Sequence, residues 1–350
     1  MSFLVFLFFF SQNPLYSADQ LTSKLLFAGD VMFEWNVRET MDTIRPDYSL
    51  VVSEMESVFQ EADFRMLNLE TPVIAEDYNL DVSIHPDKPY VFRAFPADIS
   101  ILKSLSVNLV SLGNNHAMDF GQKGLRQTRT FLKNEGLLSI GAGDNFTSAY
   151  QPYKFSANKQ NFTIYSSSLI GQQDTFASKE KGGIAKFETG YLVRDLANIR
   201  KNAGNDISQK ILSLHWGIEY SPAPESYQRR VAHRLIDFGF SAVIGHHPHI
   251  PQGVEKYKNG IIFYSLGNFI FGSKNQLLNH NLVAILHFSE NKLKIAEIIP
   301  VFGKFQELNS FYIYPLAGEE ANSFLQEICI QSRKLGTEIF IKNNRGYIYF

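Results

Sequence analysis

One local pattern recurs along the chain: a short apolar run that ends in residues with polar or metal-ligating side chains. Apolar runs of this length, bounded by Gly and Asn, indicate buried β-strands. The six runs are KLLFAGD (24–30), FRMLNLE (64–70), VNLVSLGNNH (107–116), KILSLHWGIEY (210–220), AVIGHHPH (242–249) and GIIFYSLGNF (260–269). The pattern therefore predicts a core of buried strands with polar groups at the strand ends.

Helical spacing of apolar residues separates these strands. Residues 55–62 and 321–328 each place apolar side chains at i, i+3, i+4 and i+7, which indicates amphipathic helices. Helices are also expected over three further segments, residues 97–105, 123–135 and 225–238. Gly136 and Gly239 follow two of these segments and suit helix C-caps. Strands that alternate with helices predict an α/β fold.

The second half of the chain is richer in strands. NFTIYSSSLIG (161–171) predicts a strand, and the polar, glycine-bearing segment 172–187 predicts a loop over the site. Residues 281–314 alternate in a way that predicts further strands. We expect one compact domain over residues 22–314, with a C-terminal helix and strand (315–350) packing on it.

Composition excludes some classes of protein. The chain has 350 residues, of which 45% are hydrophobic, and 30 are Phe and 16 Tyr, so it can bury a large core. Its formal net charge is −2 and no Lys/Arg-rich run is present, which argues against a nucleic-acid partner. Small anionic substrates stay open, because a local metal ion or Arg can override the global charge.

The single cysteine, Cys329, excludes an internal disulfide and a cysteine-based metal site. It stands in FLQEICIQS, an apolar helix face, so we expect a buried structural residue.

The N-terminus carries a short apolar segment. Residues 3–10 are entirely apolar, too few for a spanning helix, but they match the central region of a signal peptide. Ser17 and Ala18 supply small residues for cleavage, although the expected basic start is missing. We expect residues 1–18 to be an export signal or short anchor, with a buried N-terminal segment or a truncated start as alternatives.

The strand ends carry the chemistry. In open α/β sheets, ligands bind beyond the carboxyl ends of the strands. Taken singly, each ending has a structural explanation, such as a turn at Asp30 or a satisfied core histidine at His215. Together, carboxylate, amide oxygen and imidazole suit Zn, Mn or Fe. Five runs end in such groups: Asp30, Asn68 with Glu70, Asn114 to His116, His215, and His247 with His249.

The GHHPH segment holds three of the nine histidines. Pro248 disfavours the helical region for His247, so we expect an extended backbone in which His247 and His249 face the same side. They would then form a metal clamp, while His246 points elsewhere and is not a ligand. The other histidines, which we expect to be structural or surface residues, are His85, His233, His280 and His287.

In order, these motifs resemble the CapA-type family of bacterial poly-γ-glutamate capsule synthesis proteins, which is similar to the calcineurin-like metallophosphoesterases. The resemblance covers about residues 24–272 and rests on Gly-Asp, Asn-Leu-Glu, Gly-Asn-Asn-His, His-Trp-Gly-x-Glu-Tyr, Gly-His-His-Pro-His and Ser-Leu-Gly-Asn-Phe. It implies a four-layer α/β/β/α sandwich with a divalent metal centre of one or two ions between two sheets.

The resemblance also implies roles for individual residues. Asp30 would be the first carboxylate ligand, and Glu70 would stand where phosphoesterases place a bridging Asp. Asn115 would ligate through its amide oxygen, and His116 would be the catalytic proton donor. The imidazole ligands would be His215, His247 and His249. The residues assigned to substrate binding are Arg93, as an anion clamp, with Asn114, Glu219 and Asn268.

One position departs from the phosphoesterase pattern. Those enzymes usually have Asp-x-His at the first strand, whereas this chain has Met32 at the third position. A thioether is a poor ligand for a hard metal, which puts a full dinuclear centre in doubt, although the CapA-like group itself commonly lacks that His. Glu34 lies close by in sequence and is a candidate substitute.

Three functions remain open. The first is a metal-dependent hydrolase or transferase of the cell envelope or periplasm, exported or membrane-associated, acting on a phosphoester or an anionic polymer such as poly-γ-glutamate. The second is a non-catalytic metal- or polymer-binding component of a membrane complex for polymer synthesis or export. The third, a glycosidase using Glu70 and Glu219, leaves the histidines unexplained.

Overall fold

The structure is a computed structural model. It describes residues 22–44, 47–75, 89–188, 208–273, 278–303, 305–306 and 310–350. The expected signal segment, residues 1–18, lies outside these ranges. No helix in the described ranges is long and apolar enough to cross a membrane.

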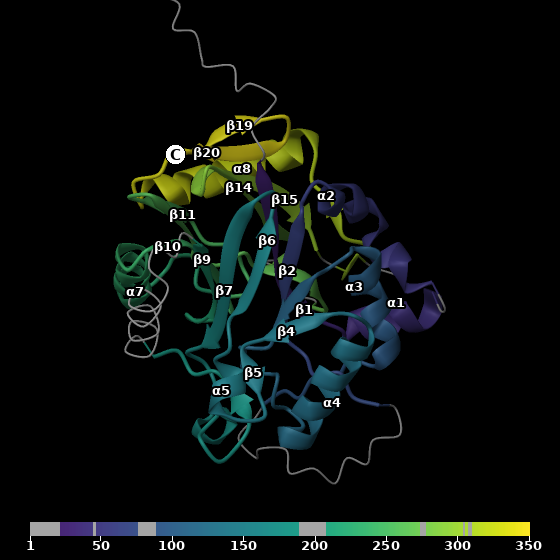
Figure 1. The fold of residues 1–350 in the computed structure, drawn as a ribbon. Helices are drawn as coiled ribbons and strands as arrows, with labels where there is room; N and C mark the ends of the chain where they lie inside the picture. Colours follow the sequence, from purple (N-terminus) through teal and green to yellow (C-terminus); the bar gives the residue numbers. More distant parts are fainter. Residues whose placement is uncertain are drawn as a thin grey trace, which may run out of the picture.

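The fold is mixed α/β, as expected, and is built on two large sheets (Figure 1). The larger has ten strands, with the order β19-β20-β15-β14-β1-β2-β3-β4, while β13 pairs with β1 and β18 with β15. Its strands are β1 (Ser23–Met32), β2 (Phe64–Leu69), β3 (Leu109–Ser111), β4 (Leu138–Ile140), β13 (Asn268–Phe271), β14 (His280–Ser289), β15 (Lys292–Phe302), β18 (Tyr314–Pro315), β19 (Phe340–Lys342) and β20 (Arg345–Tyr349).

The second sheet has six strands in the order β11-β12-β10-β9-β7-β6. They are β6 (Tyr153–Ala157), β7 (Gln160–Ser168), β9 (Gln209–His215), β10 (Phe240–His246), β11 (Val254–Tyr257) and β12 (Gly260–Phe263). Two small pairs complete the described strands: β5 (Ala142–Gly143) with β8 (Gly183–Ile184), and β16 (Phe305–Gln306) with β17 (Ser310–Phe311).

Helices lie on both sides of the sheets. In Figure 1, α1 to α4 lie to the right of the sheets and α7 to the left, with α8 at the top. The α-helices are α1 (Asn36–Ile44), α2 (Glu56–Gln60), α3 (Ile99–Ser104), α4 (Gly121–Asn134), α5 (Phe146–Ala149), α7 (Ser226–Asp237) and α8 (Gly318–Arg333). The 3₁₀ helices are η1 (Tyr48–Met55), η2 (Pro96–Asp98) and η3 (Gln173–Thr175).

Side chains that alternate along each strand enter different apolar clusters. On β1, Leu26 joins a cluster with α1, α3 and α4, whereas Leu25 joins a second cluster shared by both large sheets. On β9, Ile211 enters that second cluster, and Leu212 enters a third cluster with α7. The alternation follows from the two-residue period of a strand, and it leaves both sheets covered on both faces.

The strand β14 confirms one of the strands expected within residues 281–314. Its central residues are buried on both faces, because Val283 and Ile285 enter the first cluster and Leu282 and Ala284 the second. The C-terminal segment also adds to the second cluster through α8, and β20 pairs with β15. Cys329 on α8 is buried, as expected.

Candidate metal centre

The strand register brings the predicted polar endings together at one edge of the two sheets. Asp30 on β1 stands opposite Asn68 on β2 and Asn268 on β13. In the second sheet, His246 on β10 stands opposite His215 on β9. These strand pairs are parallel, and Asp30, Asn68, His215 and His246 lie towards the carboxyl ends of their strands, where α/β sheets bind ligands. Asn268 instead begins β13.

Asp30 is fully buried at the centre of this edge. Its Oδ1 accepts a hydrogen bond from Asn68 Nδ2 at 2.8 Å and lies 3.0 Å from His246 Nδ1. Its Oδ2 accepts from the backbone N–H of His247 at 3.1 Å and lies 3.6 Å from His249 Nδ1. Burial by itself raises the pKa of Asp30, but the contact with His246 and the surrounding imidazoles outweigh it and hold that pKa well below its usual value.

Glu70 is also fully buried, yet no N–H or hydroxyl group within the described ranges donates a hydrogen bond to its carboxylate oxygens. His215 Nε2 lies 3.4 Å from Glu70 Oε1. Burial, and then the charge of Asp30, raise the pKa of Glu70 well above its usual value. A buried carboxylate without partners is costly, and a cation bound beside it would offset that cost.

Glu70 is shared by two groups of side chains that could hold a metal ion. One group is Glu70, His215 and His247, and the other is Asp30, Glu70 and His249; in each, the ligand atoms lie within 4.8 Å of one another. The exposed Glu219 forms a third such group with His247 and His249. Carboxylate and imidazole donors of this kind fit a borderline divalent ion.

Two of the three imidazoles are held neutral. Burial lowers the pKa of His215 to about 3, and burial together with the neighbouring His215 and His249 lowers the pKa of His247 well below its usual value. For His249, burial opposes the charged form, but Glu70 and Asp30 outweigh it and raise the pKa. A neutral imidazole has the lone pair that metal coordination requires, so His215 and His247 are ready to ligate at neutral pH.

Two asparagines contact this cluster from the loop after β3 and from β13. Asn115 Oδ1 lies 2.7 Å from His215 Nε2. Asn268, predicted to bind substrate, places its Oδ1 2.9 Å from His249 Nδ1. This contact fixes the orientation of the His249 ring, and the substrate-binding role of Asn268 stays a prediction.

Asn114 holds the loop rather than facing a cavity. It is fully buried, and its Nδ2 donates to Asn68 Oδ1 at 3.0 Å and to the Leu69 carbonyl at 2.9 Å. Its Oδ1 accepts from the backbone N–H groups of His116 at 3.1 Å and Ala117 at 2.9 Å. The predicted substrate contact of Asn114 therefore has no support in its hydrogen bonds.

His116 is oriented by an acidic residue. Its Nδ1 lies 2.8 Å from Asp119 Oδ2, an oxygen that also accepts from the backbone N–H of Phe92 at 2.7 Å. The His116 ring stacks on that of Phe92, with centroids 4.1 Å apart. This arrangement favours the tautomer with a proton on Nδ1.

Arg93 is half-buried, and its guanidinium lies 4.5 Å from the centroid of the Phe95 ring. Its backbone N–H donates to Glu34 Oε1 at 3.1 Å. The anion-clamp role of Arg93 stays a prediction.

The GHHPH backbone differs from the expected extended form. His247 and His249 have φ of +96° and +59°, outside the extended region that Pro248 was expected to impose. The turn allows the His247 N–H to reach Asp30, and non-glycine residues at positive φ concentrate at functional sites. The two rings still lie close, with centroids 6.0 Å apart. The prediction that His246 points elsewhere was wrong, because it contacts Asp30.

Met32 lies in an apolar contact. Its side chain is buried against Phe92 and Phe271, and its sulfur accepts the backbone N–H of Glu34 at 2.8 Å. Glu34 is absent from all three candidate metal groups found within the described part of the chain. The structure therefore gives no support to Glu34 as a substitute ligand.

The histidines expected to be structural are paired with carboxylates away from the centre. The distances to the acceptor oxygens are 2.9 Å for His233 and Glu255, 3.0 Å for His280 and Glu320, and 2.8 Å for His287 and Glu297. His85 lies outside the described residues.

The sequence reasoning missed two residues of the centre, His246 and Asp119. The i, i+3 spacing of His116 and Asp119 is a usable signal, because one turn brings such residues together. The contact of His246 with Asp30 joins residues more than two hundred positions apart in two different sheets, and no local pattern predicts it.

Comparison with known proteins identifies a matching family and several relatives. The model of a family described as "Bacterial capsule synthesis protein PGA_cap" matches residues 24–273. The chain is 28% identical over 286 residues to the "Capsule biosynthesis protein CapA" of Bacillus anthracis, covering 79% of this chain and 66% of that one. It is 26% identical over 288 residues to the "PGA biosynthesis protein CapA" of Bacillus subtilis, covering 82% and 72%.

Among solved structures, a hypothetical protein from Thermus thermophilus is similar with a TM-score of 0.49 and 15% identity, over 83% of this chain and 99% of that one. The chain spans just under two thirds of the length of the Bacillus anthracis relative.

Proposed function

Since the chain belongs to the PGA_cap family of bacterial capsule synthesis proteins, we propose that it acts in the synthesis or processing of poly-γ-glutamate at the bacterial cell envelope. The names of the Bacillus relatives support this role. A location at the envelope, exported or membrane-associated, follows from the site of capsule assembly.

The finer proposal is that the protein is a divalent-metal-dependent hydrolase or transferase acting on a phosphoester or on the anionic polymer. The observation that carries it is the buried Glu70, whose oxygens have no hydrogen-bond partner in the described structure and which belongs to two candidate metal groups. Glu70 would hold the ion or ions together with His215, His247, Asn115, Asp30 and His249.

A bound Mn, Zn or Fe ion would supply Lewis-acid polarisation of a phosphoryl or carbonyl oxygen and a lowered pKa for water. Asp30 brings negative charge to the centre, and Asn268 orients His249. His116 protonates the leaving group, because Asp119 holds its Nδ1 proton and leaves Nε2 to carry the transferred one. General acid catalysis of this kind contributes about 10²–10⁴ in rate.

A second candidate is a non-catalytic metal- or polymer-binding component of a membrane complex for polymer synthesis. The observation that favours it is Met32, which sits in an apolar contact at the position where phosphoesterases supply an imidazole. A centre that lacks this ligand binds a second ion less well. Turnover of metal-loaded protein decides between the two candidates.

We further propose that the layers form a four-layer α/β/β/α sandwich of the metallophosphoesterase type. The three apolar clusters support this order, because they separate helices, sheet, sheet and helix. Residues 22–314 would form the domain, and residues 315–350 would be its C-terminal addition. Residues 1–18 would direct export or anchor the protein.

Replacing His247 by Ala tests the metal centre. Wild-type protein loaded with Mn or Zn should hold about one or two equivalents by elemental analysis, whereas His247→Ala should lose most of them, because removing a ligand costs about 10–100-fold or more in affinity. His280→Ala is the matched control, since its carboxylate partner Glu320 is half-exposed and outside the centre. Wild-type metal content in His247→Ala would contradict the proposal.

Turnover of bis-p-nitrophenyl phosphate and of a γ-glutamyl oligomer by the metal-loaded wild type tests catalysis. Metal binding without turnover on either substrate would favour the non-catalytic component.

A further inference from the structure

A cavity lies at the opposite end of the strands that carry the candidate metal centre. Its volume is about 560 Å³, within the range of small-ligand sites. Gln209 and Phe240, at the starts of β9 and β10, line it, whereas His215 and His246 end the same strands at the centre. At about 3.3 Å per residue the two sites are about 20 Å apart.

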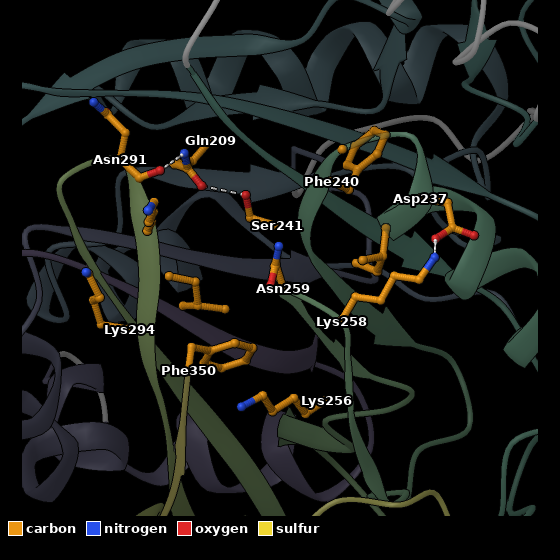
Figure 2. Close-up of a pocket in the computed structure, with 14 residues that line it drawn as sticks. Gln209, Asp237, Phe240, Ser241, Lys256, Lys258, Asn259, Asn291, Lys294 and Phe350 are labelled. Atoms are coloured by element: carbon orange, nitrogen blue, oxygen red, sulfur yellow. Dashed lines mark hydrogen bonds and ion pairs between the residues drawn. The ribbon is translucent and has the colours of Figure 1, made fainter.

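Four lysines converge on this cavity from two separate parts of the chain. Lys256 and Lys258 come from β11 and its turn, and Lys292 and Lys294 come from β15. Lys292 and Lys294 stand on either side of Leu293 at the start of β15, where a bulge interrupts its pairing with β14. Figure 2 shows Lys256 beside the ring of Phe350, the amine of Lys258 directed at Asp237, and Lys294 on the opposite side of the ring from Lys258.

The lysines outnumber the acidic groups of the cavity. Asp237 is the one side-chain carboxylate among the lining residues, where Phe350 also carries the terminal carboxylate, and Asp237 is paired with Lys258. Lys294 pairs with the exposed Glu290 at 3.3 Å, and Lys256 donates to the Tyr349 carbonyl at 2.6 Å. Lys292 is exposed and makes no ion pair with any residue that the structure describes. The cavity therefore has an excess of positive charge in a chain whose net charge is −2.

The floor combines apolar and amide groups. Phe240, Leu293 and Phe350 supply the apolar part. The amide of Gln209 donates to the Asn291 carbonyl at 2.6 Å and accepts from Ser241 Oγ at 2.6 Å (Figure 2). This floor suits a ligand that carries methylene groups between its charges.

We propose that this cavity binds a polymer of carboxylates, as a second site separate from the metal centre. Lysines, unlike arginines, act as point charges without a fixed bidentate geometry, so they suit a chain of repeated carboxylates that binds in more than one register. A γ-glutamyl chain presents one carboxylate and two methylenes per residue, which match the lysines and the apolar floor. The identity of the polymer rests on the proposed function, whereas the presence of an anion site rests on the cavity alone.

The test is the affinity of the full chain for a labelled γ-glutamyl oligomer of about ten residues, measured by fluorescence anisotropy in chelator at low ionic strength. Replacing Lys292 and Lys294 by Gln should weaken binding about tenfold, the expected effect of losing two partly exposed charge contacts. Added salt should weaken wild-type binding further. The matched control is Lys123→Gln with Lys133→Gln, which removes two exposed charges from α4 and should change affinity less than about twofold.

Three results would overturn the proposal: no saturable binding by the wild type, equal affinity in wild type and the Lys292/Lys294 variant, or equal loss in the α4 control. A parallel measurement with inorganic polyphosphate tests whether the site prefers carboxylates to phosphates. If the protein binds polyphosphate but does not bind the glutamyl oligomer, the carboxylate assignment is overturned. His247→Ala separates this site from the proposed function. Oligomer binding that persists in that variant supports the second site even if the metal centre proves inactive.

Discussion

Two buried carboxylates in this protein, Glu70 and Glu255, have similar burial and opposite surroundings. Glu255 accepts hydrogen bonds from His233 at 2.9 Å, Arg229 at 3.3 Å and the Tyr264 hydroxyl at 2.6 Å. Glu70 also lies beside an imidazole, yet its oxygens accept no hydrogen bond from any described residue. Glu255 ties α7 to β11 and β12, so its burial is explained by the fold alone. The burial of Glu70 is not, which is why the metal proposal rests on it.

The largest effect on stability that we predict comes from replacing Glu255, the carboxylate that accepts three hydrogen bonds. Glu255→Ala removes the shared partner of the buried Tyr264 hydroxyl, of the Arg229 guanidinium and of the His233 ring, and should lower the free energy of unfolding by about 3 kcal/mol. Chemical denaturation measures this loss. Metal content should stay at the wild-type level, and a loss below about 1 kcal/mol would remove the contrast with Glu70.

The next effect concerns Glu70 and the stabilisation of the folded protein by a bound metal ion. Mn or Zn at about 100 times its Kd should stabilise the wild type by about 2.7 kcal/mol, because the ion binds only the folded state. Glu70→Gln should lose most of this stabilisation, since an amide replaces the central charge. Thermal unfolding with metal and with chelator measures the difference.

Glu255→Gln is the matched control for this measurement and should keep the metal-dependent shift. The metal-free Glu70→Gln protein should be no less stable than the metal-free wild type. A strong destabilisation there would mean that Glu70 has a structural partner.

The smallest effect sharpens the comparison with a third carboxylate, Glu297. Burial opposes its ionisation, but hydrogen bonds from His287 and Arg345 outweigh it and lower the pKa of Glu297 to about 2. Its folded pKa lies below the usual value of 4.5, so its stabilisation is complete above about pH 4.5 and is lost as the pH falls towards 2. The difference in unfolding free energy between wild type and Glu297→Gln should therefore shrink from pH 6 to pH 3. A difference independent of pH over that window would contradict this assignment.

Local patterns predicted much of the fold and the gathering of the site. The apolar runs at 24–30 and 210–220 are strands in the structure, and their polar endings meet because parallel strands align their carboxyl ends. The strands expected within residues 281–314 are confirmed by β14 and β15. Local pattern failed at His246, because the backbone turn after β10 and the contact with Asp30 depend on the packing of two sheets. Local sequence patterns could not predict the lysine cavity, because its charged side chains come from segments that lie far apart in sequence.

The pairing of β1 with β13 has a consequence for the order of events during synthesis. Gly29 lies so close to Gly267 that a Cβ on Gly29 would stand 2.1 Å from the Gly267 oxygen, and this contact sets Asp30 beside Asn268. The ribosome adds about 5–20 residues per second, so Asn268 follows Asp30 after roughly 10–50 s. For much of that interval the nascent chain carries Asp30 and Glu70 without the histidines of β9 and β10. The complete set of candidate ligands therefore comes together late in translation or after it, so the proposed metal would be loaded during maturation rather than during early folding.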